Sequence, residues 1–429
     1  MDAKRERYTP NDVGPSPLEW KAPRLSEVST LITNGFVGTA TPFYTDITGV
    51  PYLYGTNVRA NKLETNEIRY VTREFHTAQS KTALKAGDLL TVQSGHIGET
   101  AVVTDQFHGA NCHALIVTRL KQEKADPHYL CFYVNSEIGR ARMKGLEVGS
   151  TILHINTKDL KKFRVLLPSL PEQKKIAQIL STWDKAISVT EKFLANSQQQ
   201  KKALMQLLLT GKKRLLDENG VRFSREWKQV ELGDVFEKVS NGLTYDANSL
   251  DGLPVTRIET ISTGRVNFEK VGWAPDCDNT RRFKLNLGDI LYSHINSLEH
   301  IGRVAYFNDD KPLYHGMNLL LLRTKMQNNS LFLFHLLNSQ VGKKYAKTYA
   351  KSAVNQASIS TTDIKTFKVF IPERLEQQKI AAVLSAADAE ISTLEKKLAC
   401  LKDEKKALMQ QLLTGKRRVK VDAEEAVSA

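Results

Sequence analysis

The sequence predicts an α+β fold in which two mixed α/β domains are separated by two long antiparallel coiled-coil helices, all related by a pseudo-twofold internal repeat. The stretch from Glu172 to Arg214 returns without a gap from Glu376 to Arg418, with most aligned positions identical. Each copy carries apolar residues at the alternating spacing of a heptad repeat. The regions that precede the two copies are mixed in pattern and more distantly related to each other.

The heptad pattern of each copy predicts a coiled-coil seam of about five heptads. The predicted seam residues are Ile176, Leu180, Trp183, Ile187, Leu194, Leu204 and Leu208 in the first copy, and Ile380, Leu384, Ile391, Leu394, Leu398, Leu401, Lys405, Leu408 and Leu412 in the second. Antiparallel pairing in one consistent register sets Ile176 opposite Leu412, and it places the mixed regions at opposite ends of a rod. The same register puts Lys405 over the indole of Trp183, a contact worth about 0.5–2 kcal/mol.

The boundaries of the parts follow from this repeat and from changes in composition. In chain order we predict an N-terminal arm at 1–19, a first mixed domain at 20–168, a first spacer helix at 169–214, a linker at 215–226, a second mixed domain at 227–372, a second spacer helix at 373–418 and a polar tail at 419–429. Short apolar runs broken by Gly, Asn and Pro indicate strands in both mixed domains. One helix is predicted from Pro127 to Lys144, where apolar residues recur at helical spacing.

The two mixed domains share short motifs although their loops differ in length. The pair Asn34-Gly35 returns as Asn241-Gly242, and a Gly-Asp strand start at Gly87 returns at Gly288. We interpret the shared motifs as scaffold and the differing loops as determinants of specificity.

The charge balance favours a polyanionic partner. The chain has 429 residues with 61 Lys plus Arg against 47 Asp plus Glu, a formal net charge of +14. Nucleic acid is the simplest such partner, and a solvated basic surface is the alternative. The four cysteines are scattered without a paired motif, which predicts neither a disulfide framework nor a zinc ribbon. No apolar run is long enough to span a membrane, so we expect a cytoplasmic protein.

One combination of motifs resembles a known family. The motif LPSLPEQKKIA from Leu167 and its altered copy IPERLEQQKIA from Ile371 each lead into a long heptad helix that ends in LLTGK. Together with the two divergent domains, over nearly the whole chain, these resemble the specificity (S) subunit of a type I restriction-modification enzyme. The second copy departs by having Leu375 at the place of Pro171 and Ala387 at the place of Trp183.

The resemblance implies a function in host defence. The divergent regions would be target recognition domains that each read one half of a bipartite double-stranded DNA target, and the helices would be conserved spacers that dock two methyltransferase (modification) subunits. Adenine-N6 methylation and ATP-driven restriction would be performed by those subunits and by restriction/translocase subunits. S-adenosylmethionine, ATP and Mg are therefore expected on the partners, and no cofactor on this chain.

Motifs for chemistry in the chain itself are missing, which predicts that the chain is not an enzyme. No glycine-rich cofactor loop follows a predicted strand, and the TGK at Thr210 and Thr414 follows a helix. His108, Cys112 and His113 cluster without a second ligand pair, so no metal site is predicted. Asp276 and Asp278 could begin a nuclease-like carboxylate set, with a solvated turn as the favoured alternative.

Candidate DNA contacts lie on loops beside the shared motifs, because base edges are read by polar side chains and phosphates by cations. The candidates for base readout are Asn57, Arg59, Gln93, Ser94 and His96 in the first domain and Arg257, Glu259, Thr260, His294 and Asn296 in the second. The candidates for phosphate contact are Lys81, Lys85, Arg281, Arg282 and Lys284. For each single residue, a role as a solvated loop residue or turn cap is the alternative.

Two further expectations concern partners. The motifs EQxKIA and KKALMQ recur in both helices, and we expect them on outward faces where two copies of one partner would demand the same residues. Two other classes remain as alternatives to the specificity subunit: a stand-alone DNA-binding coiled-coil protein with an architectural or regulatory role, and an enzyme with an unrecognised site.

Overall fold

The computed structural model describes residues 8–9, 16–147, 153–353 and 356–421. The chain forms two compact units, of which unit 1 comprises Met1–Thr190 with Lys397–Ala429 and unit 2 comprises Glu191–Lys396. Each unit holds one mixed domain and a part of both long helices, α5 (Leu170–Leu208) and α11 (Arg374–Leu412). Most of the predicted arm at 1–19 and tail at 419–429 lies outside the described residues.

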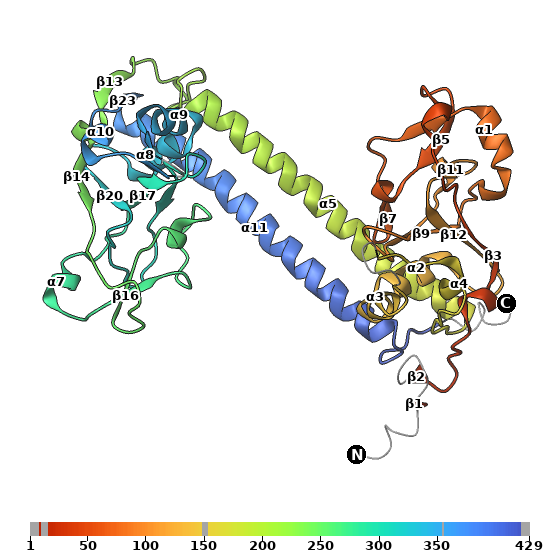
Figure 1. Ribbon diagram of the computed structural model, residues 1–429. Coiled ribbons are helices and arrows are strands. Elements are labelled where there is room, and N and C mark those ends of the chain that lie inside the picture. Colours follow the sequence, from red (N-terminus) through yellow and green to blue (C-terminus); the bar gives the residue numbers. More distant parts are fainter. Residues whose placement is uncertain (1–7, 10–15, 148–152, 354–355, 422–429) are drawn as a thin grey trace. The chain divides into compact units, whose positions relative to one another are not determined.

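Unit 1 is built on two four-stranded sheets (Figure 1). Its strands are β1 (Tyr8–Thr9), β2 (Ser16–Pro17), β3 (Ser29–Asn34), β4 (Tyr44–Thr45), β5 (Val50–Leu53), β6 (Val58–Arg59), β7 (Lys62–Leu63), β8 (Arg69–Val71), β9 (Leu89–Val92), β10 (Thr100–Val102), β11 (Asn111–Cys112) and β12 (Leu115–Leu120). Its shorter helices are α1 (Arg73–Ala78), α2 (Pro127–Asn135), α3 (Glu137–Lys144) and α4 (Thr157–Leu160). One sheet is antiparallel in the order β10-β9-β12-β3, and the other has the order β11-β5-β8-β4 with β11 parallel to β5.

Unit 2 repeats the first of these sheets in the same order, as β19-β17-β20-β14. Its strands are β13 (Lys228–Glu231), β14 (Phe236–Asn241), β15 (Leu253–Val255), β16 (Gly272–Ala274), β17 (Ile290–Tyr292), β18 (Ile295–Asn296), β19 (Val304–Tyr306), β20 (Leu320–Thr324), β21 (Lys351–Ala353), β22 (Gln356–Ser358) and β23 (Lys368–Ile371). Its shorter helices are α6 (Leu232–Val235), α7 (Asp278–Arg281), α8 (Ser330–Asn338), α9 (Gln340–Tyr349) and α10 (Thr361–Lys365). The shared strand order makes the internal repeat a repeat of fold as well as of sequence.

The helix predicted from Pro127 to Lys144 is wrong as one element, because the structure divides it into α2 and α3. Ser136 between them is extended, with φ −66° and ψ 162°, and its hydroxyl accepts a hydrogen bond from the Gly139 N–H at 3.1 Å. A serine that caps the next turn ends one helix and starts another. Ser339 does the same between α8 and α9.

The repeated Gly-Asp motif is a scaffold device in both domains. Gly87 and Gly288 have φ of +89° and +92°, a conformation that favours glycine. The aspartate that follows each of them is 1% exposed and forms a bidentate ion pair with an arginine of the neighbouring strand: Asp88 with Arg119 at 2.9 and 2.7 Å, and Asp289 with Arg323 at 2.8 and 2.7 Å. The motif therefore fixes the start of β9 and of β17, which explains why it is retained while the loops differ.

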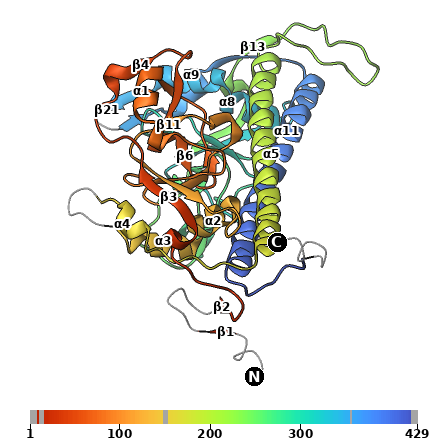
Figure 2. The same cartoon turned by 90° about the vertical axis from the view of Figure 1, so that its right-hand side faces the viewer.

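The apolar core of each unit joins the mixed domain to the long helices. In unit 1, Tyr129, Leu130 and Tyr133 of α2 share one cluster with Ile176 and Leu180 of α5. Leu412 of α11 belongs to the same cluster. Figure 1 and Figure 2 both show α2 beside α5 in unit 1. Unit 2 repeats the arrangement with α8, the end of α5 and the start of α11.

The two long helices pair antiparallel within each unit, which confirms the predicted fold class. In unit 1, Lys405 of α11 forms an ion pair with Asp184 of α5 at 2.5 Å. In unit 2, Lys201 of α5 forms the equivalent pair with Asp388 of α11, also at 2.5 Å. The predicted seam residues of both helices are all buried or half-buried.

The prediction that Lys405 lies over the indole of Trp183 is wrong. The ammonium of Lys405 lies 5.3 Å from the ring centroid of Phe132 and pairs with Asp184, the neighbour of Trp183. A carboxylate within hydrogen-bonding distance attracts an ammonium more strongly than the face of an indole does.

The expectation that EQxKIA lies on an outward face is also wrong. Glu172, Gln173, Glu376 and Gln377 are all at most 2% exposed. Glu376 accepts two hydrogen bonds from Arg214, which follows the end of α5. Glu172 accepts two from Arg418, which follows the end of α11. The motif is therefore repeated because both units use it internally.

The glutamine of the motif attaches the mixed domain to the helix pair. The amide oxygen of Gln173 accepts a hydrogen bond at 2.9 Å from the N–H of Asp126, the residue that caps α2. Gln377 does the same at 2.9 Å for Asn329, which caps α8. One glutamine thus orients the first helix of each domain against its spacer helix.

Cysteines in place of Leu194 and Leu394, which are both half-buried on the seam in unit 2, test the register. We expect an intramolecular disulfide under mild oxidation, because the predicted register sets the two residues opposite each other. Gel mobility under non-reducing conditions reports the bridge, with a cysteine at the exposed Lys192 in place of Leu194 as the matched control. The register is refuted if the control pair crosslinks as readily as the seam pair.

Candidate nucleic-acid interface

The first pair of candidate loops follows β5 and β15, and two of its predicted base readers are structural. Asn57 is 2% exposed and Thr260 is 0% exposed. The side-chain oxygen of Asn57 accepts from the Tyr54 N–H at 2.9 Å, and that of Thr260 accepts from the Arg257 N–H at 2.8 Å. Both residues cap equivalent turns and are inaccessible to a base edge. The prediction of base readout is therefore corrected for this pair.

The other candidates of these two loops keep some exposure. Arg59 is half-buried and donates to the carbonyl oxygens of Val58 and Gly55 at 2.9 and 3.5 Å. Arg257 is half-buried and lies 3.6 Å from the exposed carboxylate of Glu259. Arg59 is thus held within its own hairpin, whereas Arg257 and Glu259 present charged groups at the surface.

The second pair of loops follows β9 and β17. In unit 1, Gln93 is half-buried, while Ser94 and His96 are exposed. In unit 2, the amide of the half-buried Asn296 donates to Ser293 Oγ at 3.1 Å. His294 is 8% exposed, and burial lowers the pKa of its imidazole to about 4. A neutral ring at this depth does not reach a base, so His294 is corrected to a core residue.

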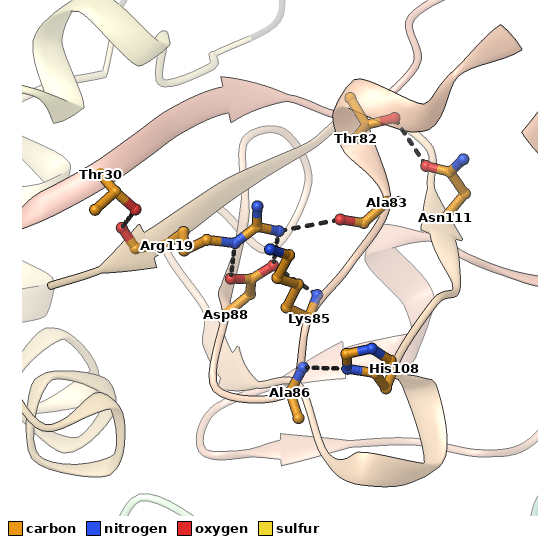
Figure 3. A network of polar contacts seen from close by, with 9 residues as sticks. All are labelled: Thr30, Thr82, Ala83, Lys85, Ala86, Asp88, His108, Asn111 and Arg119. Atoms are coloured by element: carbon orange, nitrogen blue, oxygen red, sulfur yellow. Dashed lines mark hydrogen bonds and ion pairs between the residues drawn. The ribbon is translucent and has the colours of Figure 1, made fainter. Parts of the chain in front are cut away.

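The phosphate candidates lie at the surface beside the Gly-Asp motifs. Lys81, Lys85, Arg281, Arg282 and Lys284 are all exposed. Figure 3 shows the backbone N–H of Lys85 donating to Asp88, at 2.8 Å, so the scaffold carboxylate fixes the backbone that carries this cation. Arg281 is partly neutralised by Asp276 at 2.8 Å, and Asp278 lies 3.9 Å from the same guanidinium. These two aspartates therefore lie in an exposed turn beside an arginine. This arrangement agrees with the solvated turn that was the favoured alternative to a nuclease-like carboxylate set.

The cluster of His108, Cys112 and His113 is not a ligand set. Burial raises the pKa of the Cys112 thiol to about 12. The two histidines have separate partners: His108 Nδ1 accepts from the backbone N–H of Ala86 at 3.4 Å, whereas the ring of His113 stacks on Tyr54. Across the described ranges, no group of three or more His, Cys, Asp or Glu residues could hold a metal ion.

Sequence reasoning missed one group of polar and aromatic residues on the second sheet of unit 1. Arg69 of β8 has its guanidinium carbon 5.3 and 4.9 Å from the ring centroids of Tyr44 and Tyr54. Tyr54 in turn stacks on His113 at 5.0 Å and an interplanar angle of 28°. These four residues, here called the Arg69 cluster, come from separate segments with no common spacing, so no local pattern predicts that they meet.

Comparison with known proteins identifies the family. Residues 17–196 and 224–402 match the family described as type I restriction modification DNA specificity domain. The chain belongs to this family. The two matched stretches each contain one mixed domain and continue into one long helix.

The chain is also similar to curated specificity subunits of other type I restriction enzymes. The chain is 43% identical over 195 residues to the type I restriction enzyme MjaX specificity subunit of Methanocaldococcus jannaschii. The aligned region covers 44% of this chain and 46% of that protein. The chain thus spans less than half the length of that relative. It is 24% identical over 409 residues to the EcoKI specificity subunit of Escherichia coli, covering 90% and 85% of the two chains. The predicted resemblance to specificity subunits is confirmed.

Solved structures share the fold of this specificity subunit. A crystal structure of a type I restriction-modification S subunit from M. genitalium matches with a TM-score of 0.61 at 15% identity, covering 92% of this chain and 96% of that one. A chain from a study of complex assembly and conformational transition of the type I restriction-modification system matches with a TM-score of 0.52 at 17% identity, covering 94% and 99%. At such identities the likeness concerns the fold alone. Among the described residues, no helix is long and apolar enough to cross a membrane.

Proposed function

We propose that this specificity subunit directs a type I restriction-modification complex to a bipartite double-stranded DNA target. Each target recognition domain reads one half of the target, and the chain itself is non-catalytic. The observation that carries the proposal is the duplicated scaffold with unlike surfaces. The two domains share a strand order and the Gly-Asp ion pair, whereas the side chains on their equivalent loops differ. One fold used twice with different surface residues suits the reading of two different half-sites.

The long helices set the unread spacer between the half-sites. α5 and α11 are each 39 residues long, and ion pairs and buried apolar residues fix their pairing in both units. At about 1.5 Å per residue, such a helix is about 58 Å long. For comparison, half-sites on one face of the duplex lie about 34 Å apart. The helix pair is therefore long enough to serve as a spacer on the scale of one to two turns of DNA.

Two methyltransferase subunits dock on the helix pair. Support comes from residues that are identical and exposed in both helix copies although neither unit uses them in its core. These residues are Lys192 and Lys396, Ala203 and Ala407, and, just after the two helices end, Lys212 and Lys416. Two copies of one partner, each bound to one helix copy, would require the same residues on both helix copies. S-adenosylmethionine, ATP and Mg then bind to the methyltransferase and restriction/translocase subunits, which perform adenine-N6 methylation and DNA cleavage.

A matched insertion in both helices tests the proposal. We expect one extra helical turn, about four residues, at Gln198–Gln200 to lengthen the unread spacer and leave both half-sites intact. Because Ser197 bonds to Glu390 and Lys201 pairs with Asp388 on either side of this point, the same insertion is needed after Ala389 to keep the seam in register. Sequencing that detects methylated adenines in cells with the partner subunits gives the target.

The control for this experiment is the insertion in α5 alone. It should shift Lys201 away from Asp388 and lower the stability of unit 2. An altered half-site with an unchanged spacer in the matched variant would contradict the proposed role of the helices. Tight, specific binding by the isolated chain, with no change in methylation when the chain is deleted, would instead favour a stand-alone DNA-binding protein.

A further inference from the structure

We propose that the Arg69 cluster of the first recognition domain reads a guanine of one half-site. Arg69 would donate to the O6 and N7 acceptors of that guanine in the major groove. This inference rests on the proposed function and adds to it a named reader and a named base. It concerns a surface that contains none of the residues predicted from the sequence to contact DNA.

Arg69 is a fixed cation without an anionic partner. The side chain is exposed, and no carboxylate of the described residues pairs with it. Its Nη1 donates to the hydroxyl of Tyr44 at 3.0 Å, and its guanidinium lies over the rings of Tyr44 and Tyr54. The hydrogen bond to Tyr44 raises the pKa of Arg69, so the charge is permanent. By contrast, the half-buried Arg119 is engaged by the buried carboxylate of Asp88 and by the carbonyl oxygen of Ala83.

The aromatic residues hold the guanidinium in place before a ligand binds. The hydroxyls of Tyr44 and Tyr54 are hydrogen-bonded to each other, and Tyr54 stacks on His113. The hydroxyl of the fully buried Tyr52 lies 3.3 Å from Nδ1 of His113 and so anchors the stack to the core. A side chain that is already ordered loses less entropy on binding, which favours precise recognition.

The second domain builds the antiparallel strand pair equivalent to β5-β8, as β15-β16, without this cluster, so this pair does not require it. A parallel bridge joins Phe36 to His113 in unit 1, and the equivalent bridge joins Leu243 to Gly316 in unit 2. The equivalence places a glycine where the first domain has its histidine. It also places Arg257 where the first domain has Tyr54, since both backbone N–H groups donate to the equivalent caps Asn57 and Thr260. A cluster confined to one domain, on a scaffold that both share, is what a half-site-specific reader requires.

The chemistry of the exposed groups selects guanine. An arginine guanidinium has five N–H donors in a planar fork, which matches the two acceptors of guanine in the major groove. Its Nη1 bond to Tyr44 leaves donors of the same fork for a ligand. Burial and the charge of Arg69 lower the pKa of His113, so the imidazole adds no second positive charge at neutral pH. The site therefore offers hydrogen-bond donors in a defined plane, which suits the two acceptors of a guanine edge.

The test maps methylated sites in cells that contain the partner subunits and either the wild-type chain or an Arg69 variant. With Arg69→Ala we expect one fixed guanine of one half-site to become degenerate, with a loss of discrimination of about 5- to 150-fold at that position. The other half-site and the spacer should stay unchanged. Arg69→Lys keeps the charge but lacks the planar fork, so it should also lose the preference. Arg73→Ala removes one exposed cation of the adjacent helix α1 and is the matched control that should keep the target.

The outcomes separate this inference from the proposed function. A wild-type bipartite target that Arg69→Ala and Arg69→Lys leave unaltered would overturn the inference and leave the proposed function intact. Uniformly weaker methylation of the same target would assign Arg69 to a phosphate and also overturn it. If the wild-type chain directs no bipartite methylation, both fail. Should Arg69→Ala not accumulate in cells, Arg69→Lys decides, because it preserves a positive charge beside the tyrosines.

Discussion

Replacing Arg214 with alanine is expected to destabilise unit 2 by about 3–5 kcal/mol. Arg214 forms two hydrogen bonds of 2.6 Å with Glu376, whose side chain is 0% exposed. Among the described residues, removal of the guanidinium leaves this buried carboxylate with only the indole N–H of Trp227, 3.3 Å away, as a side-chain donor. The midpoint of urea unfolding, with hydrogen exchange measured separately for the two units, reports the effect and its location.

A surface ion pair in the same region supplies the control for this prediction. Arg225 pairs with Glu373 at 2.8 Å but its side chain is 71% exposed, so Arg225→Ala should cost about 1 kcal/mol or less. The double replacement Arg214→Met with Glu376→Leu should recover most of the lost stability, because neither charge is then buried alone. Equal effects of Arg214→Ala and Arg225→Ala would show that the buried pair does not stabilise the junction between domain and helix.

Exchanging residues 20–168 for the corresponding domain of another specificity subunit is expected to replace one half-site completely and leave the other half-site and the spacer unchanged. The structure indicates which donor residues must be retained. The domain contacts its helix pair through Asp126, whose N–H donates to Gln173, and through Trp20, which lies 5.9 Å below the guanidinium of Arg418. A donor domain with both residues should therefore dock on this helix pair without loss of stability.

The reciprocal exchange of residues 227–372 is the matched control. It should alter only the other half-site, since Asn329, Gln377 and Trp227 make the equivalent attachment in unit 2. Methylation mapping of both chimaeras measures each half-site separately. A chimaera in which both half-sites change would contradict the independence of the two domains.

The fold could be predicted from the sequence because its long-range pairings are encoded in local patterns. The heptad spacing of residues such as Ile176 and Leu412 marks the seam, and both are 0–1% exposed in the structure. The polar partners of the seam could not be predicted so well. Lys405 pairs with Asp184 rather than with Trp183, because the carboxylate lies one residue beyond the heptad position and within reach of a long side chain.

The candidate site could be located from the sequence only as a set of loops. The loops that hold Asn57 and Thr260 are equivalent turns, but polar residue type alone does not separate a cap from a reader. Asn57 is such a cap: its side-chain oxygen accepts from the Tyr54 N–H, and its amide nitrogen donates to the carbonyl oxygens of Glu64 and Asn66. The Arg69 cluster depends on strands β4, β5 and β8 coming together, which is a tertiary event without a local signature.

The most direct test of the central claim compares methylated adenines in the genome of cells with and without this chain, while the partner subunits are kept. We expect methylation at one bipartite target to be present with the chain and lost without it, and to return on complementation. Unchanged adenine methylation in the absence of the chain would contradict the claim that this subunit selects the DNA target.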